Sequence, residues 1–248
     1  MTSFLLNNSK KKHANFTLLC SVFLSSFVFA QTDFSTESYY KTYDTLSQNI
    51  NLINGKEYLD TYRSLKKENH KFYNSDIFLK GSIVYSEQPY YGVEFKYDIL
   101  NDLIIVELIN EKVSYVSLNS ELVAEFTLAG DKFIHLPNHE VLERYYRNGY
   151  FKESFKGTNY TLFTKYIKDK NEVIDQLKVY YTFNSKENYF LQKDDTYYQI
   201  NNIKDLTSIF NSQKKLIQSF YKENKNLYRI NREQFFKTIL FTLDNINA

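Results

Sequence analysis

The hydrophobic pattern of the chain changes period near residue 200, and this change constrains the fold more than any other feature. Between residues 81 and 200, short apolar runs alternate with polar residues; Val93, Phe95 and Tyr97, for example, alternate with charged side chains. Successive side chains of a β-strand point to opposite faces, so a period of two indicates a half-buried strand. Turn residues separate the runs at a spacing of roughly 8 to 12 residues, which is typical of an antiparallel meander. We therefore expect an antiparallel β domain over residues 81–200, forming a roll, barrel or sandwich.

The predicted strands are rich in β-branched and aromatic residues, which suit a pleated surface. They lie at Ile83–Tyr85, Val93–Tyr97, Leu103–Ile109, Val113–Ser117, Phe126–Leu128, Phe133–Leu136, Gly149–Phe155, Tyr160–Ile167, Leu177–Phe183, Tyr189–Gln192 and Tyr197–Ile200. Residues of turn type predict turns at Asn54-Gly55, Asn101-Asp102, Ala129-Gly130 and Asp194-Asp195, and Gln88-Pro89 breaks the run between two predicted strands. The charged run Lys165–Lys170 is interpreted as the solvated edge of a loop.

Residues 201–248 have helical periodicity instead, and predict about three helices packed on the sheet. A first apolar face combines Ile203, Leu206, Ile209 and Phe210, and a second combines Leu216, Ile217 and Phe220 after a cap at Ser212. The third helix, capped by Asn231, places Phe235, Phe236, Ile239, Leu240 and Leu243 on one face. The expected fold class is therefore α+β and mostly β.

The residues before the sheet divide into two segments. Residues 31–80 form a polar N-terminal lead with a first strand or helix, because Glu57–Lys67 fits either structure. Residues 1–30 have the order of a secretory signal peptide, with basic residues at Lys10–His13, an apolar run at Phe16–Ala30 and cleavage before Gln31. The alternative is an uncleaved anchor, but a membrane span needs roughly 18 to 20 apolar residues and this run is shorter.

Cys20 lies inside that apolar run and is the only cysteine of the chain. Leu19 precedes it where a lipoprotein signal has a small residue, so we interpret Cys20 as part of the signal core. After cleavage no cysteine would remain, which excludes disulfides and thiolate metal sites.

Charge and composition bear on which ligands the protein could bind. The leader carries three lysines and no acid, so the remainder of the chain is near neutral and gives no electrostatic case for binding nucleic acid. Tyrosine and phenylalanine are abundant (23 and 21) and tryptophan is absent. Two explanations stay open, a sugar-binding aromatic surface and a genome rich in A and T, and the second is favoured.

One histidine cluster suggests a metal site. His135 and His139 are four residues apart, with Glu140 and Glu143 nearby. Zinc needs three or four such ligands. Pro137-Asn138 lies between the histidines and argues against a helix there, so a solvated loop after a strand is the favoured interpretation.

Asp98 and Asp102, with Glu94 nearby, suggest a pair of glycosidase carboxylates. Aspartate and asparagine are also the residues that tight turns use for local hydrogen bonds, and this alternative is favoured. The chain has no Gly-x-Ser-x-Gly nucleophile motif and no glycine-rich phosphate loop. No catalytic residue, metal ligand or cofactor is therefore assigned from the sequence.

Several segments in order resemble a known group of proteins. They are Asn54–Tyr58, Gly81–Tyr85, Tyr97–Val106, Phe126–Phe133, Gly149–Phe151 and the helices that begin at Lys204. Together they resemble an uncharacterised family of exported, β-rich proteins of Bacteroidota-type bacteria. The resemblance implies a periplasmic or envelope-associated protein and supplies no catalytic residues.

These observations favour an exported envelope protein, periplasmic or secreted, without a transmembrane span in the mature chain. We expect a non-enzymatic module that binds a partner protein, peptide or lipid-linked ligand. The alternative is a hydrolase acting on envelope glycan or peptide, and a structural or adhesive role is a third possibility. Association with the outer membrane stays open.

Overall fold

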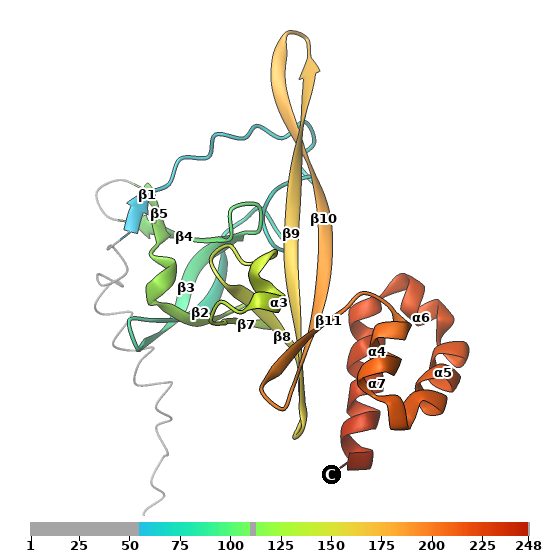
Figure 1. Ribbon diagram of the computed structural model, residues 1–248. Coiled ribbons are helices and arrows are strands. Elements are labelled where there is room, and N and C mark those ends of the chain that lie inside the picture. The colour runs from blue at the N-terminus through green and yellow to red at the C-terminus, as the bar shows by residue number, and fades with distance from the viewer. Residues whose placement is uncertain (1–54, 110–112, 248) are drawn as a thin grey trace, which may run out of the picture. The chain divides into compact units, whose positions relative to one another are not determined.

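The computed structural model describes residues 55–109 and 113–247. Residues 1–54 lie outside the described residues. They include the predicted signal peptide with Cys20, most of the predicted N-terminal lead, and Asn54 of the first predicted turn. Within them, one antiparallel sheet of 11 strands is followed by a group of helices, as Figure 1 shows. The predicted α+β, mostly β fold class is therefore confirmed.

The strands differ widely in length. They are β1 (Gly55–Glu57), β2 (Leu79–Tyr85), β3 (Gln88–Asp98), β4 (Leu103–Ile109), β5 (Val113–Leu118), β6 (Val123–Leu128), β7 (Asp131–His135), β8 (Tyr150–Lys156), β9 (Tyr160–Asp175), β10 (Lys178–Lys193) and β11 (Thr196–Ile200). Their order in the sheet is β1-β5-β4-β3-β2-β6-β7-β8-β9-β10-β11. The pairing of β2 with β6 therefore joins the strands β1–β5 to the strands β6–β11. The sheet is open, with β1 and β11 at its edges, and is not a closed barrel.

The alternating residues of the central strands build the main core. Phe95 and Tyr97 of β3 point to the same face as Phe126 of β6 and Phe133 of β7, and all four are buried. The Phe126 and Phe133 rings are stacked with centroids 4.7 Å apart, while Tyr97 meets both edge-on. Aromatic pairs in these geometries are worth about 0.5–1.5 kcal/mol beyond the burial of their surface.

Most of the predicted turns are confirmed. Asn101-Asp102, Ala129-Gly130 and Asp194-Asp195 all lie between consecutive strands, and each pair includes residues with positive φ. The break predicted at Gln88-Pro89 lies two residues earlier in the structure, because the chain turns at Ser86-Glu87, where φ is 49° and 64°. Pro89 lies inside β3 opposite Val84.

The longest hairpin contradicts one sequence interpretation. β9 and β10 have 16 residues each and pair along their whole length. Lys165–Lys170, predicted as a solvated loop edge, lies inside β9, and Lys165 is buried. Leu177–Phe183 and Tyr189–Gln192, predicted as separate strands, both belong to β10, except Leu177, which lies in the turn before it. β8 pairs with β9 no further than Thr164, so the hairpin extends beyond that neighbour (Figure 1).

The described residues form more helices than the three or so that the sequence predicts. They are α3 (Glu140–Glu143), α4 (Ile203–Ile209), α5 (Lys214–Glu223), α6 (Lys225–Ile230) and α7 (Arg232–Asn247), with short 3₁₀ turns η3 (Ser120–Leu122) and η4 (Asn211–Gln213). Of these, α3 and α6 were not predicted. Among the described helices, none has both the length and the apolar character that crossing a membrane requires.

Of the two N-terminal caps predicted for the C-terminal helices, one is confirmed and one is wrong. Asn231 caps α7, because its side-chain oxygen accepts a hydrogen bond from the backbone N–H of Gln234 at 2.9 Å. The predicted Ser212 cap is wrong: Ser212 lies in η4 and its hydroxyl donates to Gln213, whereas α5 begins after Gln213 without a side-chain cap.

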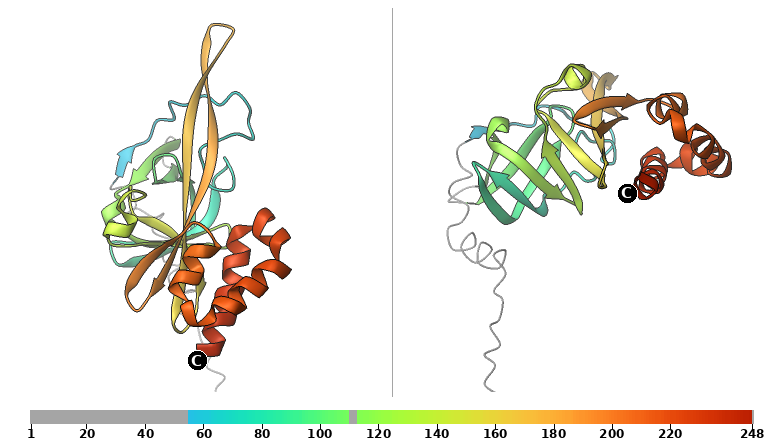
Figure 2. Two further views of the ribbon diagram at one scale, coloured as in Figure 1. Left: turned by 45° about the vertical axis from the view of Figure 1, so that its right-hand side comes forward. Right: turned by 60° about the horizontal axis from the view of Figure 1, so that its bottom comes forward.

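The helices α4 to α7 pack beside the end of the sheet formed by β9, β10 and β11, as Figure 2 shows. Tyr189 of β10 contacts Phe236 of α7 with ring centroids 5.1 Å apart, and Tyr160 of β9 contacts Phe210 at 4.9 Å. The apolar faces predicted for these helices are therefore used for packing on the sheet.

The segment that the sequence left ambiguous is neither a full strand nor a helix. β1 ends at Glu57, and the chain then runs without regular structure from Tyr58 to Phe78, apart from isolated bridges such as Phe72 to Asp98. Backbone hydrogen bonds from Tyr73 N–H to Tyr97 and from Ile99 N–H to Lys71 fix it beside the end of β3.

Candidate functional site

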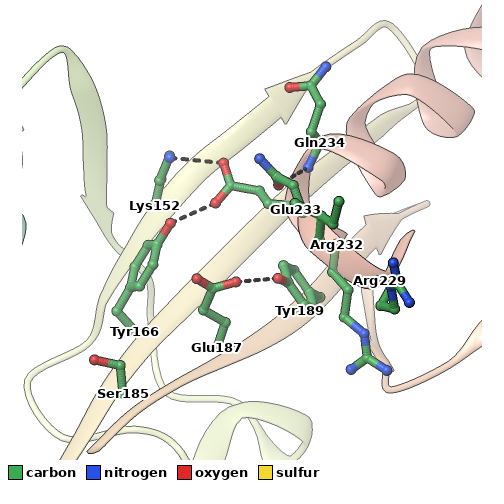
Figure 3. Close-up of a pocket in the computed structure, with 11 residues that line it drawn as sticks. Lys152, Tyr166, Ser185, Glu187, Tyr189, Arg229, Arg232, Glu233 and Gln234 are labelled. Carbon is green, nitrogen blue, oxygen red and sulfur yellow. Dashed lines mark hydrogen bonds and ion pairs between the residues drawn. The ribbon is translucent and has the colours of Figure 1, made fainter. Parts of the chain in front are cut away.

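The candidate site is a pocket of about 590 Å³ between one face of β8–β10 and the beginning of α7. Its sheet side carries Lys152, Tyr166 and Glu187, and its helix side carries Arg232 and Glu233, as Figure 3 shows. Residues directly opposite each other in an antiparallel pair share a face of the sheet. Tyr166 pairs with Glu187, which brings a phenol and a carboxylate to the same face.

An ionic network fixes one wall of this pocket. Lys152 Nζ lies 2.8 Å from Glu233 Oε1 and 2.8 Å from Asp131 Oδ1. The Tyr166 hydroxyl donates to Glu233 Oε2 at 2.6 Å, and the Tyr73 hydroxyl donates to Asp131 Oδ2 at 2.5 Å. Lys152 thus bridges the sheet and α7, and every charged group of this wall has a partner.

The pKa values in this network follow from burial and from the paired charges. Burial acts to lower the pKa of Lys152, but its hydrogen bonds to Asp131 and Glu233 outweigh burial and raise it. Burial, and then the hydrogen bond to Glu233, raise the pKa of Tyr166. Lys152 is therefore positively charged and Tyr166 neutral at physiological pH.

The opposite wall holds charges without such partners. Arg229 Nη2 donates to Asn226 Oδ1 at 3.1 Å, and the Arg232 guanidinium lies 4.8 Å from the centre of the Tyr228 ring. Neither arginine has a carboxylate within ion-pair distance in the described part of the chain. Glu187 accepts a hydrogen bond from the Tyr189 hydroxyl. The pocket therefore offers both signs of charge to a ligand.

The edge of β10 beside the pocket is open. On the side away from β9, β10 pairs with β11 only from Tyr189 to Lys193. Further along, the backbone of Phe183 exchanges two hydrogen bonds with the side chain of Asn69. Between them, residues 184–188 have no strand partner on this edge within residues 55–109 and 113–247.

The predicted histidine cluster does not assemble into a ligand set. His135 ends β7 and lies beside Tyr146, with 3.3 Å between its Nε2 and the tyrosine hydroxyl. His139 caps α3, and its Nδ1 accepts from the backbone N–H of Val141 at 3.2 Å. Glu140 and Glu143 lie exposed on α3. The described residues include no group of three or more His, Cys, Asp or Glu side chains that could hold a metal ion.

Two of the predicted carboxylates, Asp102 and Asp98, are buried, and each has its own set of hydrogen-bond partners. Asp102 is buried, and its oxygens accept from the Tyr97 hydroxyl at 2.5 Å, the Asn148 backbone N–H at 2.7 Å and Lys165 Nζ at 2.7 Å. Burial lowers the pKa of Lys165, against the opposing effect of Asp102. These partners make Asp102 part of the core rather than of the pocket.

Asp98 is buried as well and has the turn role that the sequence favoured. Its oxygens accept from the backbone N–H and the side-chain amide of Asn101, at 3.0 Å and 2.9 Å, and from the Tyr58 hydroxyl at 3.2 Å. Lys71 Nζ is 3.6 Å away. Glu94 forms an ion pair with Lys80, whose Nζ is 3.7 Å from its Oε1.

Comparison of the chain with protein families, with curated proteins and with solved structures finds no match in any of the three. The site is therefore interpreted from its own geometry. Sequence reasoning missed it, because Lys152, Tyr166, Glu187 and Arg232 come from four different elements and form no local motif.

Proposed function

We propose that this protein is an exported component of the cell envelope that binds an extended peptide segment of a partner protein, without catalysis. The observation that carries the proposal is the open edge of β10 at residues 184–188 beside a pocket of both charge signs. An unpaired strand edge offers backbone N–H and C=O groups to an added strand. Peptide-binding domains use this mode, in which the backbone supplies affinity and nearby pockets supply specificity.

The side chains around the edge suit a peptide ligand. Arg229 and Arg232 can bind carboxylates of the peptide, and Glu187 can bind a basic group. The Lys152–Glu233–Tyr166 network holds the pocket wall in place before any ligand arrives, which reduces the ordering cost of binding.

Export is part of the same proposal and rests on the leader at residues 1–30. We expect the native protein, isolated from envelope or secreted fractions, to begin at Gln31. Sequencing of its N-terminus tests this. Retention of Phe16–Ala30 in the native protein would contradict it.

The binding proposal is tested by selecting peptides from a displayed random library on the purified protein, then measuring their affinity for variants of the strand edge. The N–H of Phe183 faces the open edge, so the N–H of Ser185, two residues further on, faces the same way. Ser185→Pro removes this donor without removing a bond to β9. We expect it to weaken peptide binding about 10-fold or more, since a strand addition loses one hydrogen bond and meets the proline ring.

Ser185→Ala is the matched control, because it keeps the N–H and should bind as the unchanged protein does. Hydrogen exchange adds a direct readout: bound peptide should protect the amides near residues 184–188. Selected peptides that bind both variants equally, or a library that yields no binder, would contradict the proposal.

A second candidate function is hydrolysis of envelope glycan or peptide. Glu187 and Glu233 line the same pocket (Figure 3), and glycosidases use two carboxylates that flank the scissile bond. Purified peptidoglycan and its peptide fragments are the substrates to test. Product release that disappears in both Glu187→Gln and Glu233→Gln would favour this function over binding alone.

A further inference from the structure

A second pocket, of about 330 Å³, lies on the face of β3–β5 that is opposite to the main core. Lys96 of β3 pairs directly with Ile105 of β4, so the two side chains share this face, whereas Phe95 and Tyr97 point into the core. The irregular segment Tyr58–Phe78 borders the pocket from the other side.

The walls of this pocket are mostly apolar. Tyr58, Leu59, Phe72, Phe78, Ile105 and Tyr115 line it. The Phe78 and Tyr115 rings are stacked at 5.2 Å with an interplanar angle of 11°, which forms a flat wall from two elements far apart in the sequence. Leu59 is 72% exposed at the rim, so an apolar group is held in water beside an apolar pocket.

One cation inside this pocket has no acidic partner. Lys96 Nζ lies 4.7 Å from the centre of the Phe72 ring and 4.6 Å from that of Phe78. Within the described residues it has no hydrogen bond and no carboxylate within 4 Å. Burial lowers the pKa of Lys96. An ammonium that is half-buried between two rings has lost part of its hydration, and an anion from outside would restore it.

The acid of the pocket already has an ion-pair partner, which it shares with Asp98. Asp60 lies at the rim, but its Oδ1 accepts from Lys71 Nζ at 2.7 Å. Lys96 is therefore the charged side chain of the lining that has no ion pair within 4 Å in the described residues, while Asp76, Asp60 and Glu107 act on it only from farther away. A pocket with apolar walls and one unpaired cation complements a ligand with an apolar body and one negative group.

We infer that this pocket is a binding site for a small apolar anion, with a carboxylate at Lys96 and a hydrocarbon or aromatic body against Phe72, Phe78 and Tyr115. The volume is at the lower end of the roughly 300–1,000 Å³ of small-molecule sites, which suits a medium-length acyl chain or a bicyclic aromatic acid. The site is separate from the pocket at α7 and does not depend on peptide binding there.

The test is calorimetric titration of the purified protein with three ligands of equal chain length: decanoate, decanol and decyltrimethylammonium. A naphthalene carboxylate, titrated in the same way, shows whether the pocket prefers a carboxylate with an aromatic body or one with an aliphatic chain. We expect the carboxylates to bind tightest. Lys96→Met should weaken carboxylate binding about 10- to 100-fold and leave decanol binding within about 2-fold, because a charge-assisted hydrogen bond is lost while the apolar walls remain.

Lys80→Met is the matched control, because Lys80 is an exposed lysine on the neighbouring strand β2 and its loss should change nothing. Phe78→Ala should weaken all ligands together, and thermal melting checks that each variant is folded. The inference is overturned if the unchanged protein binds none of the carboxylates. It is also overturned if the alcohol or the ammonium binds as tightly as decanoate, or if Lys96→Met leaves carboxylate binding intact.

Discussion

Lys165 and Asp102 illustrate at the scale of single residues how the core accepts charge. Each side chain is only 1% exposed, and their charged atoms are 2.7 Å apart. Lys165 also donates to the backbone oxygen of Tyr150 at 2.8 Å, and Asp102 accepts from Tyr97 and Asn148. Removing two charges from water costs several kcal/mol per ion, and only such complete pairing compensates for it.

The first prediction follows from this pair. Lys165→Met should lower the free energy of unfolding by about 3–5 kcal/mol, because it leaves the Asp102 carboxylate buried without its counter-charge. Combining it with Asp102→Asn should recover part of that loss, since no uncompensated charge then remains. Urea denaturation of the two single variants and the double variant measures both effects.

An exposed pair serves as the control for this cycle. Lys132 and Glu125 are 2.8 Å apart but 42% and 41% exposed, so Lys132→Met should cost less than about 1 kcal/mol. A Lys165→Met variant as stable as Lys132→Met would show that the buried pair contributes nothing.

Single residues also show where sequence reasoning stops. The turn roles of Asp98 and Asn101 were predictable, because local hydrogen bonds depend on neighbours in the chain. The burial of Lys165 was not, because its partner Asp102 is 63 residues away, in the turn between β3 and β4, and the two meet only in the folded core. A lysine in a run of charged residues carries no sequence signal for such a partner.

At the scale of elements, the β9–β10 hairpin ends in an exposed turn with an unfavourable backbone conformation. Its turn is formed by Gln176 and Leu177, both with positive φ (46° and 63°), and Leu177 is fully exposed. Two-residue hairpin turns of this kind favour asparagine and glycine, because other side chains are strained in the left-handed region.

The second prediction concerns that turn. Replacing Gln176 by Asn and Leu177 by Gly should raise the free energy of unfolding by about 1 kcal/mol, because the strain at two positions is relieved. Differential scanning calorimetry should show a higher melting temperature. The reverse substitution at a turn that already has glycine, Gly130→Ala with φ of 83°, is the control and should lower it. A hairpin variant that melts earlier than the unchanged protein would contradict the prediction.

Elements with one buried face were predictable and those with two exposed faces were not. Strands such as β3 and β4 alternate clearly because one face meets the aromatic core. Beyond Thr164, β9 pairs only with β10, and its residues from Lys170 to Asp175 are mostly exposed and polar, so no period of two marks them as part of a strand. The same reason hid α6, which has no buried residue.

At the scale of the whole molecule, Asp244 connects the C-terminal helices to the sheet. This buried residue of α7 accepts hydrogen bonds from the backbone N–H groups of Thr158 and Asn159 and from the Asn159 side chain, at 2.7 to 3.0 Å. A Cβ atom at Gly157 would collide with its carboxylate, so glycine is required in this turn between β8 and β9. Burial acts to raise the pKa of Asp244, but the three hydrogen bonds outweigh it and lower the pKa.

The third prediction uses this contact. Asp244 has a lower pKa folded than unfolded, so its contribution to stability is complete above the unfolded value of about 4 and declines as the pH falls below it. Asp244→Asn should lower the free energy of unfolding by about 1–3 kcal/mol at pH 7. The difference between the two proteins should shrink between about pH 4 and pH 2.

Urea titrations at several pH values measure that difference, and Asp175→Asn, at the exposed tip of the long hairpin, is the control and should show no difference at any pH. A gap between Asp244→Asn and the unchanged protein that stays constant down to pH 2 would contradict the prediction.

The candidate site belongs to this largest scale, which is why the sequence did not reveal it. Its lysine, tyrosine, glutamate and arginine side chains meet only after β8, β9, β10 and α7 have packed together. The overall α+β class was predictable from two hydrophobic periods, whereas the pocket depends on the register of β9 with β10 and on the position of α7, which no single segment encodes.

The position of β2 has a consequence for how the chain acquires its structure. β2 to β5 are consecutive neighbours in the sheet, so they can assemble from sequence-local pairings as soon as they have been synthesised. Until β6 arrives, the free side of β2 is a template awaiting its partner, and each later strand then adds beside its predecessor. Folding would thus proceed from the N-terminal strands towards the C-terminal ones, with Ser82–Tyr85, the stretch of β2 that pairs with β6, open to mispairing along the way.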